Sequence, residues 1–158
     1  MNTKLDKIKN FRLYLLKQID NLTTEQLNHI PSGYNNNIIW NLAHLVSAEQ
    51  TMCYVRSGLP VKVEDKYFTP YISGTKPFEF VNEQDVEAIK AMLIASLDRL
   101  QTDLDRSLFV NYTPSVMIPK VYGFEVNNIE EALEYLLYHD GYHAGYIMLL
   151  KHRLVFES

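Results

Sequence analysis

Cysteine is almost absent from this sequence, because Cys53 is the only one among 158 residues. A single cysteine excludes a disulfide within the chain and any zinc site built from several thiolates. Imidazole and carboxylate groups are therefore the metal ligands that the chain can offer. We expect Cys53 itself to be a small, buried, apolar residue.

The chain also lacks a basic cluster and a long hydrophobic run. Its 15 Lys and Arg residues against 19 Asp and Glu residues give a net charge of -4, and the isoelectric point is near 5.7. No group of basic residues could neutralise a row of phosphates, which argues against DNA or RNA as a partner. No apolar run is long enough to cross a bilayer, and residues 1–8 lack the pattern of a secretion signal. We therefore expect a cytoplasmic protein without a nucleic-acid or membrane partner.

Four stretches of the sequence have the apolar period of an amphipathic helix. They cover approximately residues 4–21, 37–56, 83–104 and 128–153. A chain of this length with 47% hydrophobic residues can bury a substantial core. These features predict an all-α protein, a four-helix bundle formed by a single domain over residues 1–158.

Polar residues that cap helices stand at the expected starts. Thr3 and Asn82 are placed to accept hydrogen bonds from the first amides of the first and third helices. Asn128 and Glu131 have the spacing of a capping box at the start of the fourth helix. Thr23 begins a similar pattern, which predicts a short extra helical turn after the first long helix.

Two connections are much longer than most links between helices. The first, residues 58–81, is long enough to run back along a helix of twenty residues, so the second and third helices are expected to point the same way. Its aromatic residues are expected to pack on the helices. The second, residues 105–126, has β-leaning segments at 108–112 and 121–125 that suggest a small hairpin. The aromatic residues of the first connection are Tyr67, Phe68, Tyr71, Phe78 and Phe80.

Three histidines are the strongest functional signal. His139 and His143 are four residues apart, so on a helix both imidazoles can reach one ion. His44, in the middle of the second helix, is expected to face the same ion. Three imidazoles would leave coordination positions open, which is typical of a reactive site; zinc, nickel, manganese and iron all accept such ligands. The alternative is that the three are core histidines bonded to backbone or tyrosine groups, while His29 and His152 are expected at the surface.

Residues beside the histidines suggest further roles. Gly141 and Gly145 are costly within a helix, which indicates close approach of a neighbouring helix or a second protomer, or else room for a substrate. Asp140 points about 100° away from His139 and is expected to be a surface acid or a partner of a ligand, and not a ligand itself. Glu49 lies off the face of His44 by about 140°, so we do not assign it as a general base.

The sequence resembles the DinB-like superfamily of metal-binding four-helix bundles, and the likeness covers nearly the whole chain. The matching segments are residues 31–33 (PSG), 38–45 (IIWNLAHL) and 139–147 (HDGYHAGYI). Where that family commonly has Gln after the second glycine, this chain has Tyr146. The change leaves the three histidines intact and is expected to alter the pocket.

The resemblance implies a fold, a metal site and a choice of activities. It implies an up-down-down-up course of the helices, a divalent metal ion held by His44, His139 and His143, and a homodimer. Characterised relatives include thiol-dependent transferases and isomerases that use bacillithiol or mycothiol, and metal-dependent hydrolases. A third possibility is a non-catalytic metal-binding protein of the stress response. We favour a thiol-dependent transferase or isomerase, because no well-placed general base is evident; the substrate and any catalytic residue stay unassigned.

Overall fold

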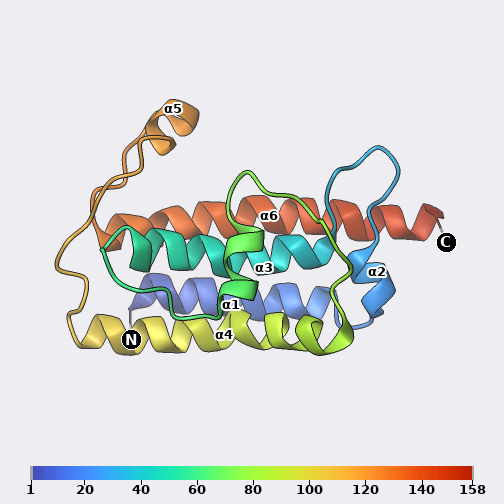
Figure 1. Ribbon diagram of the computed structural model, residues 1–158, viewed down its shortest axis with the longest axis horizontal. Helices are drawn as coiled ribbons and strands as arrows, with labels where there is room; N and C mark the ends of the chain where they lie inside the picture. Colours follow the sequence, from blue (N-terminus) through green and yellow to red (C-terminus); the bar gives the residue numbers. More distant parts are fainter. Residues whose placement is uncertain (1, 158) are drawn as a thin grey trace.

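Helices, without any strand, make up the regular structure of residues 2–157, the part of the chain that the computed structural model describes (Figure 1). Four long helices lie side by side: α1 (Thr3–Gln18), α3 (Ile38–Glu49), α4 (Glu83–Asp105) and α6 (Ile129–Glu157). α1 packs against α4 and α6, and α3 packs against the same two helices. The predicted all-α class is confirmed. Within the described range, no helix has both the length and the apolar character that a membrane span requires.

Contacts near both ends of α1 and α6 fix their relative direction. Lys4 near the start of α1 forms a 3.0 Å ion pair with Glu130 at the start of α6. Near the other end, the Lys151 ammonium donates a hydrogen bond to the backbone carbonyl of Gln18. The two helices therefore run in the same direction.

α3 and α4 also run in the same direction. The Ser96 hydroxyl donates to Glu49 at 2.8 Å, and further along both helices the Tyr54 hydroxyl donates to Asp103 at 2.9 Å. The connection between α3 and α4 must therefore travel back along the length of the helices (Figure 1). It contains two single 3-10 turns, η2 (Asp65–Tyr67) and η3 (Thr69–Tyr71).

Side-chain caps set most of the helix starts. Asn82 accepts from the amide of Asp85 at 2.9 Å, and Asn128 accepts from the amide of Glu131 at 2.9 Å. The short helix α2 (Thr24–Asn28) begins with the predicted capping box at Thr23. The predicted cap at Thr3 was wrong, because α1 begins one residue earlier.

Asn2 caps α1 in place of Thr3. Its side-chain oxygen accepts from the amides of Lys4 and Leu5, at 2.9 and 3.4 Å, so Thr3 becomes the first helical residue. Asparagine is among the best residues at this position, and an asparagine one residue upstream competes successfully with threonine.

The expected second helix is continuous, but its last part is wider than an α-helix. After Glu49 the chain forms a π-helix, η1 (Gln50–Val55), and the amide of Arg56 donates to the carbonyl of Thr51 at 3.0 Å, five residues back. Short π segments commonly mark functional regions of long helices.

The predicted hairpin between α4 and α6 was wrong. In its place the chain forms a short helix, α5 (Ile118–Tyr122), that projects from the four long helices (Figure 1). Pro119 suits the first turn of a helix, and Gly123 ends this helix in a left-handed conformation with φ of 76°. These two residues favour a helical turn over the second strand that the β-branched side chains suggested.

The aromatic residues of the first long connection are divided between core and surface. Tyr67 and Tyr71 are buried, as expected, but Phe78 and Phe80 are 65% and 60% exposed. This part of the connection is anchored through its backbone: Asn28 of α2 donates to the carbonyl of Val81 at 2.9 Å and accepts from its amide at 2.8 Å. The two phenylalanines are therefore free to face solvent.

The two glycines of α6 do not mark a close helix contact within the chain. A Cβ atom built on Gly141 or Gly145 would have no heavy atom within 4 Å, apart from the helix itself. The expectation that a neighbouring helix of this chain packs tightly against them was wrong, because both glycines lie on the exposed side of α6.

Arg12 forms the buried polar centre of the protein. On α1 it lies between Ile8 and Leu15, which belong to the two separate apolar clusters of the core. Its fully buried guanidinium bonds Asp140 of α6 through Nε and Glu49 of α3 through Nη1, both at 2.7 Å. It also donates to backbone carbonyls of α3 and α4, at 3.2 Å each. One side chain of α1 therefore bonds to all three of the other long helices.

We predict that Arg12→Met lowers the free energy of unfolding by about 3–5 kcal/mol, because two buried carboxylates would lose their cation. Lys9→Met is the matched control: it removes another α1 cation, whose ion pair with Asp98 is at the surface, and should cost less than about 1 kcal/mol. Urea denaturation of both variants measures the difference. Equal losses would contradict the importance of the buried network.

Candidate metal centre

The structure brings His44, His139 and His143 together between α3 and α6. One ring nitrogen from each lies within 4.8 Å of the others, and this group could hold a metal ion. The ring centroids are 4.5 to 5.0 Å apart. His29 and His152 are exposed, as predicted, and do not belong to this group.

Local helix geometry places each of the three rings. His139 and His143 are one turn apart on α6 and point the same way. His44 comes from α3, which runs in the opposite direction to α6 (Figure 1). The indole of Trp40 stacks on its imidazole with 4.7 Å between centroids and an interplanar angle of 11°. This stacking restricts rotation of the His44 ring.

Hydrogen bonds to acceptors fix the tautomers of two of the histidines. His44 Nδ1 lies 2.7 Å from the backbone carbonyl oxygen of Tyr71, which can only accept, so Nδ1 carries the proton. His143 Nδ1 lies 2.8 Å from Asn41 Oδ1, and the Asn41 amide nitrogen donates to the Asn37 carbonyl at 2.7 Å, which orients the amide. In both histidines the Nε2 lone pair remains available for a metal ion.

His139 is held differently. Its Nε2 faces His44 Nε2 at 3.2 Å, within the group of three. Its Nδ1 is buried without a hydrogen-bond partner and lies 4.0 Å from Asp140 Oδ1. The tautomer of His139 is therefore not fixed by an outer acceptor.

Burial keeps two of the imidazoles neutral at physiological pH. It lowers the pKa of His44 to about 4, against the opposing effect of the Tyr71 carbonyl. Burial, followed by the neighbouring histidines, lowers the pKa of His143 to about 3. A neutral imidazole is the form that binds metal, so protons compete weakly for these two sites at pH 7.

The carboxylates near the histidines belong to the Arg12 network and not to the group itself. Burial works against charge on Asp140, yet Arg12 holds the pKa of this carboxyl below its usual range. Burial raises the pKa of Glu49, although Arg12 and Ser96 both bond to it. Of the two roles expected for Asp140, that of a surface acid was wrong, since it is 1% exposed; the sequence did not predict its pairing with Arg12.

Tyrosine side chains on and near the two helices that carry the histidines have different surroundings. Tyr142 meets the His143 ring edge-on at 5.4 Å and is otherwise exposed. Tyr71 contributes its carbonyl to His44, whereas Tyr54 and Tyr67 donate to Asp103 and Asp85, away from the histidines. Cys53 is a buried free thiol, as predicted.

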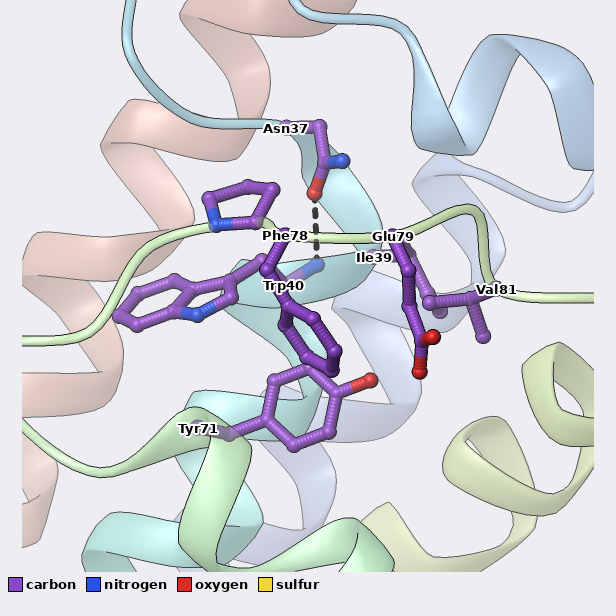
Figure 2. A pocket seen from close by; sticks show the side chains of 8 residues that line it. Asn37, Ile39, Trp40, Tyr71, Phe78, Glu79 and Val81 are labelled. Atoms are coloured by element: carbon purple, nitrogen blue, oxygen red, sulfur yellow. Dashed lines mark hydrogen bonds between the residues drawn. The ribbon is translucent and has the colours of Figure 1, made fainter.

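A hollow lies beside the residues that support His44. Figure 2 shows Trp40, Tyr71 and Phe78 around it. An open groove of about 340 Å³ shares Asn37, Pro77, Phe78 and Glu79 with this hollow and extends to Ile30 and Phe80. Exposed aromatic side chains from the first long connection therefore border a groove next to the support of one histidine.

We predict that the metal-free protein loses stability as the pH falls below the ordinary histidine value of 6.5. The unfolded chain then takes up protons that native His44 and His143 do not bind until pH 4 or below. Linkage gives at most about 1.4 kcal/mol per pH unit for each histidine, and for the two together we expect a loss of roughly 3 kcal/mol between pH 6.5 and 5. In urea denaturation, His143→Ala should reduce this slope and His152→Ala should not; identical slopes in all three proteins would contradict the prediction.

Comparison with known proteins identifies the family. The model of the DinB superfamily matches residues 9–147, a range that includes Arg12, Asn41 and all three histidines of the group. No curated protein matches the chain. Because the family match covers most of the sequence, the chain belongs to the DinB superfamily.

Proposed function

We propose that His44, His139 and His143 bind one divalent metal ion, with zinc or nickel the best candidates, and that the protein is a thiol-dependent transferase or isomerase. The observation that supports the metal site most strongly is the arrangement of protons. Two histidines donate from Nδ1 to fixed acceptors, which leaves two Nε2 lone pairs directed into the group of three. One metal ion could accept both of these lone pairs at once, whereas the single proton on a neutral His139 Nε2 could bond only one of them.

The charge behind the histidines also suits a cation. Two buried carboxylates, Glu49 and Asp140, share the single guanidinium of Arg12. When both are ionised, the network carries one uncompensated negative charge, which is costly in the interior. Asp140 follows His139 directly in the chain, so a divalent ion on the histidines would offset this charge at short range.

Three imidazoles leave room in the coordination sphere for a further ligand. Structural zinc sites normally have four protein ligands, whereas sites with three keep a position for a substrate or a solvent molecule. Among the described residues, no carboxylate or thiol joins the three histidines. This supports a reactive centre in preference to a purely structural one.

In the part of the chain that the structure describes, no carboxylate joins the three histidines on the side where an ion would bind, which favours a thiol over water as the activated group. A divalent ion bound here would act as a Lewis acid and lower the pKa of a thiol at its open position, which favours the nucleophilic thiolate. A thiol starts from a pKa near 8.5, so it ionises without a strong general base. Glu49 is bonded to Arg12 and Ser96, and the free oxygen of Asp140 faces His139 Nδ1, on the side of the ring opposite Nε2. Neither carboxylate is therefore placed to take a proton from a water molecule on the Nε2 side, as a hydrolase would require.

We infer further that the four long helices form one up-down-down-up bundle and that the chain is a single domain. The shared directions of α1 with α6 and of α3 with α4 support this course. Arg12 supports a single unit, because its contacts reach from α1 to the other three long helices.

We predict that untagged protein purified without added metal contains close to one equivalent of divalent metal, and that His143→Ala loses it. The substitution removes one of three ligands and leaves Asn41 without its donor. Elemental analysis of the purified proteins measures the metal. His152→Ala, a change of the same residue type on the same helix, is the control and should retain the metal. If wild-type protein stays metal-free even after reconstitution with zinc, nickel and manganese, the metal site is wrong.

We also predict that the metal-loaded protein binds a low-molecular-weight thiol such as bacillithiol, and that the chelator-treated protein does not. Calorimetric titration measures this difference. The S-methylated thiol has no ionisable S–H group and should bind at least about ten-fold more weakly, since a thiolate is the form that a metal prefers. Turnover of an ester or amide without any thiol, together with no thiol binding, would support a hydrolase instead.

A further inference from the structure

The three histidines differ in what holds their outer ring nitrogen. The Tyr71 carbonyl accepts from His44 Nδ1, and the Asn41 side chain accepts from His143 Nδ1. The corresponding atom of His139 is buried and has no hydrogen-bond partner. His139 is thus the one histidine of the group whose Nδ1 has no hydrogen bond to fix the orientation of its ring.

Asp140 offers the missing acceptor. Its Oδ2 bonds Arg12 Nε at 2.7 Å, but its Oδ1 is buried without a partner. This free oxygen lies 4.0 Å from the unpartnered Nδ1 of His139. A buried acceptor and a buried ring nitrogen, each without a bond, therefore lie about 1 Å beyond normal hydrogen-bond distance from each other.

The tautomer of His139 explains the gap. His44 Nε2 bears a lone pair, because the proton of His44 is on Nδ1. His139 Nε2 lies 3.2 Å from this lone pair, so in the metal-free protein His139 carries its proton on Nε2 and donates it to His44. Its Nδ1 then carries no proton and cannot donate a hydrogen bond to Asp140. The 4.0 Å separation agrees with this arrangement.

We propose that Asp140 is the positioning residue for His139, and that it accepts a hydrogen bond from His139 Nδ1 when a metal ion occupies the Nε2 side. This rests on the metal site proposed above. A metal ion needs the Nε2 lone pair, so the single proton of the neutral imidazole must be on Nδ1, facing Asp140. The imidazole stays neutral, and one proton changes position through solvent.

Arg12 makes Asp140 suitable for this role. It holds Oδ2 in place, so the carboxylate cannot turn away, and Oδ1 has to approach His139 Nδ1 by only about 1 Å to form a hydrogen bond. A carboxylate behind an imidazole makes the opposite nitrogen a stronger metal ligand. Each histidine would then have one acceptor behind it: the Tyr71 carbonyl for His44, the Asn41 amide for His143 and the Asp140 carboxylate for His139. Arg12 would connect Asp140 to the core.

The test compares Asp140→Asn with Glu49→Gln. Each variant removes one carboxylate of the same buried guanidinium, but only Asp140 is next to His139. We expect Asp140→Asn to weaken zinc or nickel binding about 10- to 100-fold, measured by competition with a chelator. Glu49→Gln removes the same unit of charge from the network but keeps the acceptor beside His139, so its loss of affinity should be at least about five-fold smaller than that of Asp140→Asn. Equal affinities in the two variants would overturn the role of Asp140.

Nuclear magnetic resonance of the wild-type imidazoles provides a measurement that does not depend on any variant folding. On zinc loading, the His139 Nδ1–H signal should appear downfield, as a proton bonded to a carboxylate. A zinc-loaded protein whose His139 proton stays on Nε2, or whose Nδ1–H shows no such bond, would overturn the assignment while leaving the metal site intact. Failure of the wild type to bind metal would overturn both.

Discussion

The fold and the candidate site both depend on one buried ion network around Arg12. Its guanidinium bonds carboxylates from α3 and α6 and backbone carbonyls of α3 and α4. Such a network is expensive to bury, and its value is in specifying how the helices fit together more than in added stability. Any shift of α1 along its neighbours would break charged hydrogen bonds, so the network fixes the register of the helices that carry the histidines.

The histidine group shows the same dependence of local geometry on distant parts of the chain. Its three side chains come from α3 and α6, but their surroundings depend on other segments: the Tyr71 carbonyl that bonds His44 is in the crossover connection, and Asp140 beside His139 is held by Arg12 of α1. The crossover is therefore part of the site and not only a link. This explains why a long, proline-containing connection includes two ordered 3-10 turns close to α3.

Sequence patterns predicted the helices well, because apolar periodicity and capping residues act locally. The all-α class, the cap at Asn82 and the proximity of the three histidines are confirmed. The hairpin prediction was wrong because it considered only the β preference of the side chains. Pro119 and Gly123 favour a short helix at this point of the chain. Arg12 was missed although it occupies a core-facing position between Ile8 and Leu15, where a basic residue should have indicated a buried carboxylate partner.

The order of these residues along the chain has a consequence for how the protein is made. Arg12 and His44 are synthesised early, whereas Asp140, His139 and His143 all belong to α6, which is synthesised after the other long helices. Until α6 leaves the ribosome, α1 carries a cation that lacks one of its two carboxylates, and α3 carries a single histidine without its companions. During synthesis, therefore, neither the Asp140 carboxylate nor the group of three histidines is complete until α6 has been made. A chain truncated before α6 would lack both.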